Sequence, residues 1–78
     1  MSSRTTNERK FGSWETTATG GRIYCRLIAG RSGWSAAYRK EVDDKEKTIR
    51  FWQEIFDESG RLREVHEKFP VDRGHRKV

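Results

Sequence analysis

The sequence predicts a mainly β fold, a single small antiparallel meander of about five strands that can curl toward a half-barrel. Residues 22–29 alternate polar and apolar side chains with the period of two that a half-buried strand requires. Glycine-rich breaks at residues 20–21 and 30–33 flank this segment, as turns flank the strands of a meander. Asp-Glu-Ser-Gly at residues 57–60 is typical of a hairpin turn between two further strands.

The chain has 78 residues, the length of one domain, and its composition leaves little material for a core. Hydrophobic residues are 32% of the sequence and charged residues 37%. Aromatic residues, at 12%, compensate because each buries a large area, so we expect a small core of Trp, Phe and Tyr. The domain should span residues 11–70, between a flexible polar tail at 1–10 and a flexible basic tail at 71–78.

Cysteine usage and hydropathy indicate the compartment. Cys25 is the only cysteine, so no intramolecular disulfide can form, which favours a reducing, cytoplasmic location. The first ten residues contain no apolar run of the kind found in secretory signals, and no stretch approaches the roughly 20 apolar residues of a membrane span. Strand alternation places Cys25 on the apolar face, away from Arg22 and Arg26, as a buried structural residue rather than a nucleophile.

Two candidate strands, residues 22–29 and 34–42, flank the second glycine-rich break. A two-residue loop between them puts all their apolar residues but Ile28 on one face. The facing pairs are then Gly30 and Gly33, Ala29 and Trp34, Leu27 and Ala36, and Cys25 and Tyr38. A loop one residue longer pairs Tyr38 with Arg26 and divides the apolar residues between two faces, so we favour the shorter loop.

Residues 44–69 fit two structures. As a hairpin, segments 48–56 and 61–69 flank residues 57–60, where Asp occupies the first position and Gly the fourth position of a type I turn. As two short helices, the apolar residues fall at helical spacing, which gives an alternative α+β fold. The chemistry of the turn and the preceding strands favour the hairpin. The heptapeptide Phe-Asp-Glu-Ser-Gly-Arg-Leu is similar to the hairpin of tyrosine-aspartate repeat proteins, a likeness that covers this turn and implies no function.

The same hairpin register predicts a pair of carboxylates. With Asp57 opposite Arg61, Glu54 faces Glu64 across the strands. Two neighbouring carboxyl groups can share a proton, as acid–base pairs do. A solvated, mildly repulsive cross-strand pair is the simpler interpretation for a surface hairpin.

The hairpin also divides its apolar residues between two faces. One face carries Ile49, Phe51, Ile55, Val65 and Phe69. The other carries Trp52, Phe56 and Leu62, and a single sheet has only one core side. These three residues are therefore a candidate interaction surface for a protein partner or a second copy of the chain, unless another segment or the sheet twist covers them.

The net charge of +5 is unevenly distributed. Residues 11–39 carry +3 and each tail carries +2, whereas residues 40–69 carry −2. The outer face of the first candidate hairpin holds Arg22, Tyr24, Arg26 and Arg39. Arginines around an exposed aromatic ring are typical of single-stranded DNA or RNA binders. The simpler alternative is a solvated face with the tyrosine packed under the arginine side chains.

Residue types used in catalysis and metal binding are present, but their spacing does not bring them together. Ser32 lies in Gly-Arg-Ser-Gly, which lacks the nucleophile-elbow spacing. His66 and His75 with one cysteine do not make a structural zinc site, and the glycine-rich segments lack the P-loop lysine. We therefore expect a non-catalytic domain without cofactor, metal or small-molecule substrate, most simply a protein-interaction or assembly module. The alternative function is binding of single-stranded nucleic acid.

Overall fold

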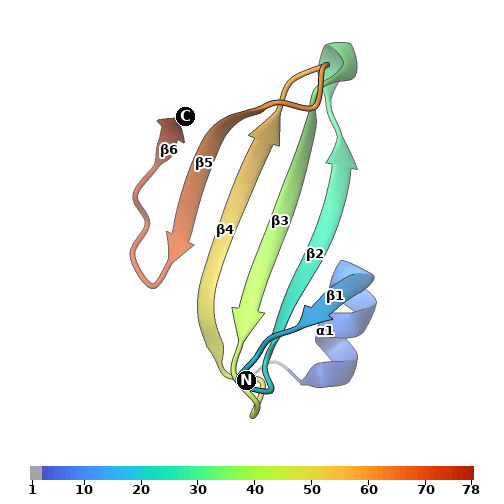
Figure 1. Cartoon of the computed structure of the whole chain (residues 1–78), viewed down its shortest axis with the longest axis vertical. Helices are drawn as coiled ribbons and strands as arrows, with labels where there is room; N and C mark the ends of the chain where they lie inside the picture. Colours follow the sequence, from blue (N-terminus) through green and yellow to red (C-terminus); the bar gives the residue numbers. More distant parts are fainter. Residues whose placement is uncertain (1–2) are drawn as a thin grey trace.

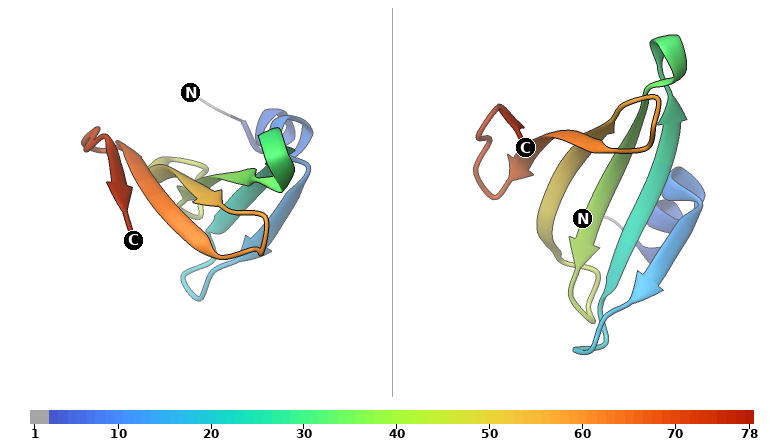
Figure 2. Two further views of the ribbon diagram at one scale, coloured as in Figure 1. Left: turned by 90° about the horizontal axis from the view of Figure 1, so that it is seen from above. Right: turned by 45° about the horizontal axis from the view of Figure 1, so that its top comes forward.

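The computed structural model describes residues 3–78 and contains a six-stranded antiparallel sheet whose strands follow one another in chain order (Figure 1). The strands are β1 Ser13–Thr16, β2 Arg22–Ala29, β3 Ser35–Val42, β4 Thr48–Phe56, β5 Leu62–Phe69 and β6 His75–Lys77. An α-helix, α1 (Arg4–Phe11), precedes the sheet, and a short 3-10 helix, η1 (Arg31–Gly33), joins β2 to β3. The predicted antiparallel meander is confirmed, and the sheet is open and strongly twisted (Figure 2).

Helix α1 replaces most of the flexible tail expected at residues 1–10, so that prediction is wrong for residues 4–10. Ser3 caps the start of the helix, because its side-chain oxygen accepts a hydrogen bond from the Thr6 N–H at 3.1 Å. Gly12 ends it in the left-handed conformation with a φ of 87° and donates its N–H to the Glu8 carbonyl. Residues 1–2 lie outside the described part of the chain.

The helix packs on one face of the sheet, here called the helix-side face. Phe11, at the end of α1, is buried against Tyr24 of β2, with ring centroids 5.8 Å apart, and Val42 of β3 completes the cluster. Tyr38 and Phe51 extend this cluster along the same face, and the Phe51 ring meets Phe11 edge-on at 6.4 Å. The core is therefore largely aromatic, as the composition predicts.

A carboxylate in the β3–β4 loop holds the helix to the sheet. Glu46, 9% exposed and with a φ of 64°, accepts hydrogen bonds from Asn7 Nδ2 at 2.9 Å and the Tyr24 hydroxyl at 2.8 Å. Arg4 of α1 adds an ion pair at 3.3 Å. Burial acts to raise the pKa of Glu46, but the hydrogen bonds from Asn7, Tyr24 and Arg4 outweigh it and leave the pKa below its ordinary value. The group is thus ionised and paired at neutral pH.

The register of the β2–β3 hairpin differs from the favoured one. Ala29 pairs with Ser35 and Arg26 with Tyr38, the pairing that a loop one residue longer gives. The loop is three residues long because η1 forms a tight turn in which the Gly30 N–H donates to the Trp34 carbonyl at 2.7 Å. This register leaves apolar side chains on both faces of the sheet. The fold accommodates them because α1 covers part of the helix-side face.

The β4–β5 hairpin is confirmed, and residues 44–69 contain no helix. Its turn has the predicted geometry: Asp57 and Arg61 are joined by a backbone hydrogen bond of 3.0 Å, and Gly60 has a φ of 83°. The Asp57 carboxylate accepts from the Ser59 N–H, the Ser59 hydroxyl and the Arg61 N–H. Local side-chain chemistry therefore determines this turn.

The predicted Glu54–Glu64 pair is absent. A register shift at Ile55/Phe56 places Glu54 opposite Val65 and Glu64 opposite Ile55. Their side chains consequently lie on opposite faces of the sheet, and they cannot share a proton. Glu54 instead pairs with Arg39.

The C-terminal segment is also more ordered than expected. Residues 71–78 were predicted to be a flexible basic tail, but His75–Lys77 form β6, which pairs with β5. His66 and His75 are directly opposite each other with ring centroids 4.5 Å apart. Asp72 binds His66 Nε2 at 2.6 Å. The contact between the two tilted rings and the cross-strand backbone pairing account for the added strand.

We predict that Asn7→Ala lowers the free energy of unfolding by about 1–3 kcal/mol, because it leaves the buried Glu46 carboxylate without one of its donors. It also removes one hydrogen-bond acceptor, Asn7 Oδ1, from the Lys40 ammonium group. Urea denaturation at about neutral pH measures the effect. Thr5→Ala, at an exposed position of the same helix, is the matched control and should change stability little. Equal losses in both variants would contradict the role of the network.

We predict that Asp57 makes folding pH-dependent at low pH. Hydrogen bonds from the Ser59 side chain and from neighbouring backbone N–H groups lower the pKa of Asp57 from 3.8 to about 2. Its stabilisation is complete above pH 3.8 and is lost as the pH falls through about 2. Asp57→Asn keeps an acceptor oxygen but does not titrate, so the difference in unfolding free energy between wild type and variant should shrink across this range. A difference that stays constant with pH would refute the assignment.

Candidate functional site

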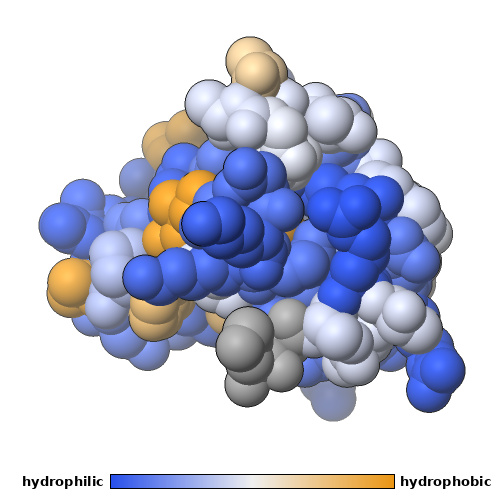
Figure 3. Space-filling view, turned by 90° about the horizontal axis from the view of Figure 1, so that it is seen from below, coloured by the Kyte–Doolittle hydropathy of each residue, from blue (hydrophilic) through white to orange (hydrophobic). Residues whose placement is uncertain are grey.

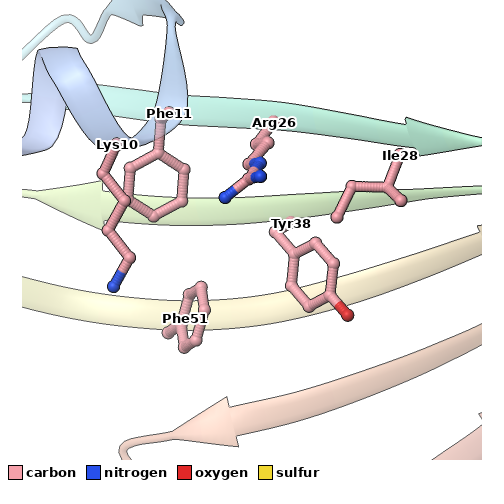
Figure 4. Close-up of a pocket in the computed structure, with 6 residues that line it drawn as sticks. All are labelled: Lys10, Phe11, Arg26, Ile28, Tyr38 and Phe51. Atoms are coloured by element: carbon pink, nitrogen blue, oxygen red, sulfur yellow. The ribbon is translucent and has the colours of Figure 1, made fainter.

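A pocket of about 250 Å³ opens on the helix-side face, next to the end of α1 (Figure 4). It is lined by Lys10 and Phe11 of α1, Arg26 and Ile28 of β2, Tyr38 of β3 and Phe51 of β4. The long-range packing of α1 onto the sheet creates the pocket, since the helix contributes one wall and three adjacent strands contribute the rest. Its volume lies below the roughly 300–1,000 Å³ of sites for drug-sized ligands, which suits a single ring system.

Aromatic rings form the apolar part of this pocket. Tyr38 and Phe51 are neighbours across β3 and β4, and both rings are only partly buried. The Tyr38 hydroxyl accepts a hydrogen bond from Gln53 Nε2 at 3.0 Å, which fixes the edge of its ring. Lys68 of β5 places its ammonium nitrogen 5.1 Å from the Tyr38 ring centroid and 5.8 Å from that of Phe51. The rings thus offer flat surfaces beside a positive charge.

Cations surround these rings. In Figure 4 the nitrogen ends of Lys10 and Arg26 extend over the strands that carry the aromatic side chains. Within residues 3–78, none of Lys10, Arg26 and Lys68 forms an ion pair with a carboxylate. The pKa of the nearby Lys40 is lowered, first by burial and then by repulsion from Lys10. Three cations therefore lie at or beside the pocket, and no carboxylate of the described residues is in direct contact with any of them.

The residues predicted to bind nucleic acid do not form one exposed face in the structure. Tyr24 is fully buried beneath α1, and Arg22 pairs with Glu8 at 2.7 Å. Arg39 lies on the opposite face and pairs with Glu54. Only Arg26 of the predicted set reaches the pocket. The prediction failed because it used the shorter loop register and treated the face that α1 covers as the outer face.

The predicted interaction surface is less exposed than expected. Trp52, Phe56 and Leu62 do share the opposite face, and Phe56 pairs with Leu62. Trp52, however, is only 9% exposed, and the Arg50 guanidinium lies over its ring at 4.4 Å. Phe56 and Leu62 are half-buried. The twisted sheet and the arginine together cover the ring that was expected to anchor a partner.

Sequence reasoning missed Lys10, Phe11, Tyr38, Phe51 and Lys68 as site residues. The signal for α1 was present in the capping residues: Ser3 precedes the helix, Gly12 follows it, and basic residues occupy its last turn. Apolar residues do not recur at helical spacing in α1, because the helix buries only Asn7 and Phe11 and one of these is polar. Placing Lys68 beside Tyr38 requires the register of three strands, which no local pattern supplies.

The described residues offer little support for other kinds of site: metal sites, a reactive cysteine, apolar surface patches or membrane spans. No three His, Cys, Asp or Glu side chains of residues 3–78 are arranged to hold a metal ion. Cys25 is unpaired and half-buried on the face opposite to Arg22 and Arg26. Seen from below, the surface is dominated by hydrophilic side chains, and hydrophobic ones appear in small separate groups (Figure 3). No described helix is both long and apolar enough to cross a membrane.

The chain matches no protein-family model, no curated protein and no solved structure. A functional proposal therefore depends on the pocket itself.

Proposed function

We propose that this domain binds single-stranded nucleic acid, with a base against the aromatic rings of the pocket and the phosphates beside its cations. One observation carries the proposal: Tyr38 and Phe51 lie among Lys10, Arg26 and Lys68, none of which forms an ion pair within residues 3–78. Aromatic stacking combined with phosphate neutralisation is how single strands are bound without sequence preference. The mechanism requires no catalytic group.

Charge and shape favour a single strand over a duplex. The net charge of +5 attracts a polyanion, and the unpaired cations of the pocket supply the local contacts. In a duplex the faces of the bases are stacked on one another, so they cannot reach Tyr38 or Phe51. An unpaired base presents a free π-face to these rings.

This function takes precedence over a protein-interaction or assembly role. The assembly role was based on an exposed Trp52 surface, and the burial of Trp52 removes its central anchor. Of the four residues that the sequence predicts to bind nucleic acid, the proposed site keeps only Arg26. Its other residues come from α1, β3, β4 and β5. The single unpaired Cys25 fits a reducing, cytoplasmic compartment for such a protein.

We predict that the triple variant K10Q/R26Q/K68Q loses most affinity for short DNA and RNA single strands at low salt. If the three cations contact three phosphates, the logarithm of the wild-type binding constant should fall with the logarithm of salt concentration with a slope of about −2. A fourfold increase in salt then weakens binding roughly 20-fold. The triple variant loses this contribution, so its slope should be less negative than the wild-type slope by about 2. Fluorescence anisotropy with labelled oligonucleotides measures both quantities.

The matched control, K45Q/K47Q/R61Q, removes the same charge from exposed residues in the two hairpin turns. It should keep most of the wild-type affinity, and circular dichroism should show both variants folded. Equal loss of binding in the two triple variants would indicate a nonspecific charge effect and contradict the pocket. Equal binding of duplex and single strand would contradict base stacking.

A further inference from the structure

A second pocket, of about 220 Å³, lies at the N-terminal end of β3. It is lined by Trp34, Arg63, Glu64, Lys77 and Val78. Trp34 directly precedes β3, whereas the charged residues come from β5 and β6. Like the first pocket, it combines an aromatic side chain with two cations, but it also contains a glutamate.

The register places both pockets on the helix-side face. Trp34 is four residues from Tyr38 along an extended strand, so their side chains point to the same side. The Gly30–Trp34 backbone hydrogen bond extends the β2–β3 ladder to this position. On the neighbouring strands Glu64 pairs with Ile55, which shares a face with Phe51. The two pockets therefore lie on the same face of the sheet.

We infer that the second pocket is a further subsite for the same nucleic-acid strand, with a second base on Trp34. The inference rests on the proposed function. Four residues of β3 separate the α-carbons of Trp34 and Tyr38 by about 13 Å, a span that a stacked single strand covers in about four nucleotides. The bound strand then runs along β3 from α1 toward β6.

The charges around Trp34 fit phosphate groups. Lys77 forms no ion pair within residues 3–78, and the half-exposed Arg63 contacts Asp57 at 3.4 Å through one nitrogen only. Glu64, the only acidic side chain among the lining residues, pairs with His75 Nδ1 at 3.4 Å. The lining side chains of Arg63, Glu64 and Lys77 leave one net positive charge.

The length dependence of oligothymidylate binding tests this subsite. Oligomers of about two, four, six and ten nucleotides are titrated against the wild type, Trp34→Leu and the matched control Trp14→Leu. Trp14 lies on β1, outside both pockets. Wild type and Trp14→Leu should bind more tightly once the oligomer spans both pockets. Trp34→Leu should lose this gain, roughly 5- to 100-fold for the longer oligomers, and keep the affinity for the shortest.

The outcomes separate the two proposals. If Trp34→Leu and wild type gain equally with length, the second subsite is refuted, while a specific loss in K10Q/R26Q/K68Q would still support the first pocket. If no oligomer binds any variant, both proposals fail. Tryptophan fluorescence gives an independent readout, because quenching by the longer oligomers should diminish in Trp34→Leu and persist in Trp14→Leu.

Discussion

The carboxylate of Glu46 is the group on which the arrangement of this domain depends. It joins Asn7 and Arg4 of the helix to Tyr24 of the sheet, from a loop that connects two other strands. A buried carboxylate is stable only when its hydrogen-bond capacity is satisfied, so these partners must converge for the fold to form. Their convergence places Phe11 on the sheet and, with it, one wall of the candidate site. A polar network therefore positions the apolar cluster.

The thin core explains why both faces of the sheet carry apolar residues. A domain of this size buries a modest fraction of its surface, and here the apolar side chains are divided between the two faces of the sheet. On the helix-side face, Phe11, Tyr24 and Val42 are buried together, whereas Ala37 and Trp52 are buried on the opposite face. Tyr38 and Phe51 stay partly exposed at the boundary of the first cluster. The candidate site occupies that boundary.

Features encoded within a few residues were predictable from the sequence, and features that depend on distant segments were not. The turn at residues 57–60 follows from Asp and Gly at fixed positions, and the meander follows from alternation between turns. The β2–β3 register does not follow from alternation alone, because α1 covers apolar residues on the helix-side face and the sheet therefore carries apolar residues on both faces. The shift near Phe56 depends on an extra residue in β5, which no side-chain pattern announces. The site combines α1 with residues of four strands, so its composition depends on long-range packing and register.

The shortness of α1 has a consequence for any ligand at the first pocket. A helix of eight residues is too short to persist in water by itself, so its formation is coupled to docking on the sheet. Undocking would remove Lys10 and Phe11 from the pocket together, while the strands stay in place. Ligand association and docking of α1 are then linked equilibria. A bound ligand disfavours undocking of the helix. In turn, the fraction of molecules with an undocked helix lowers the observed affinity for the ligand.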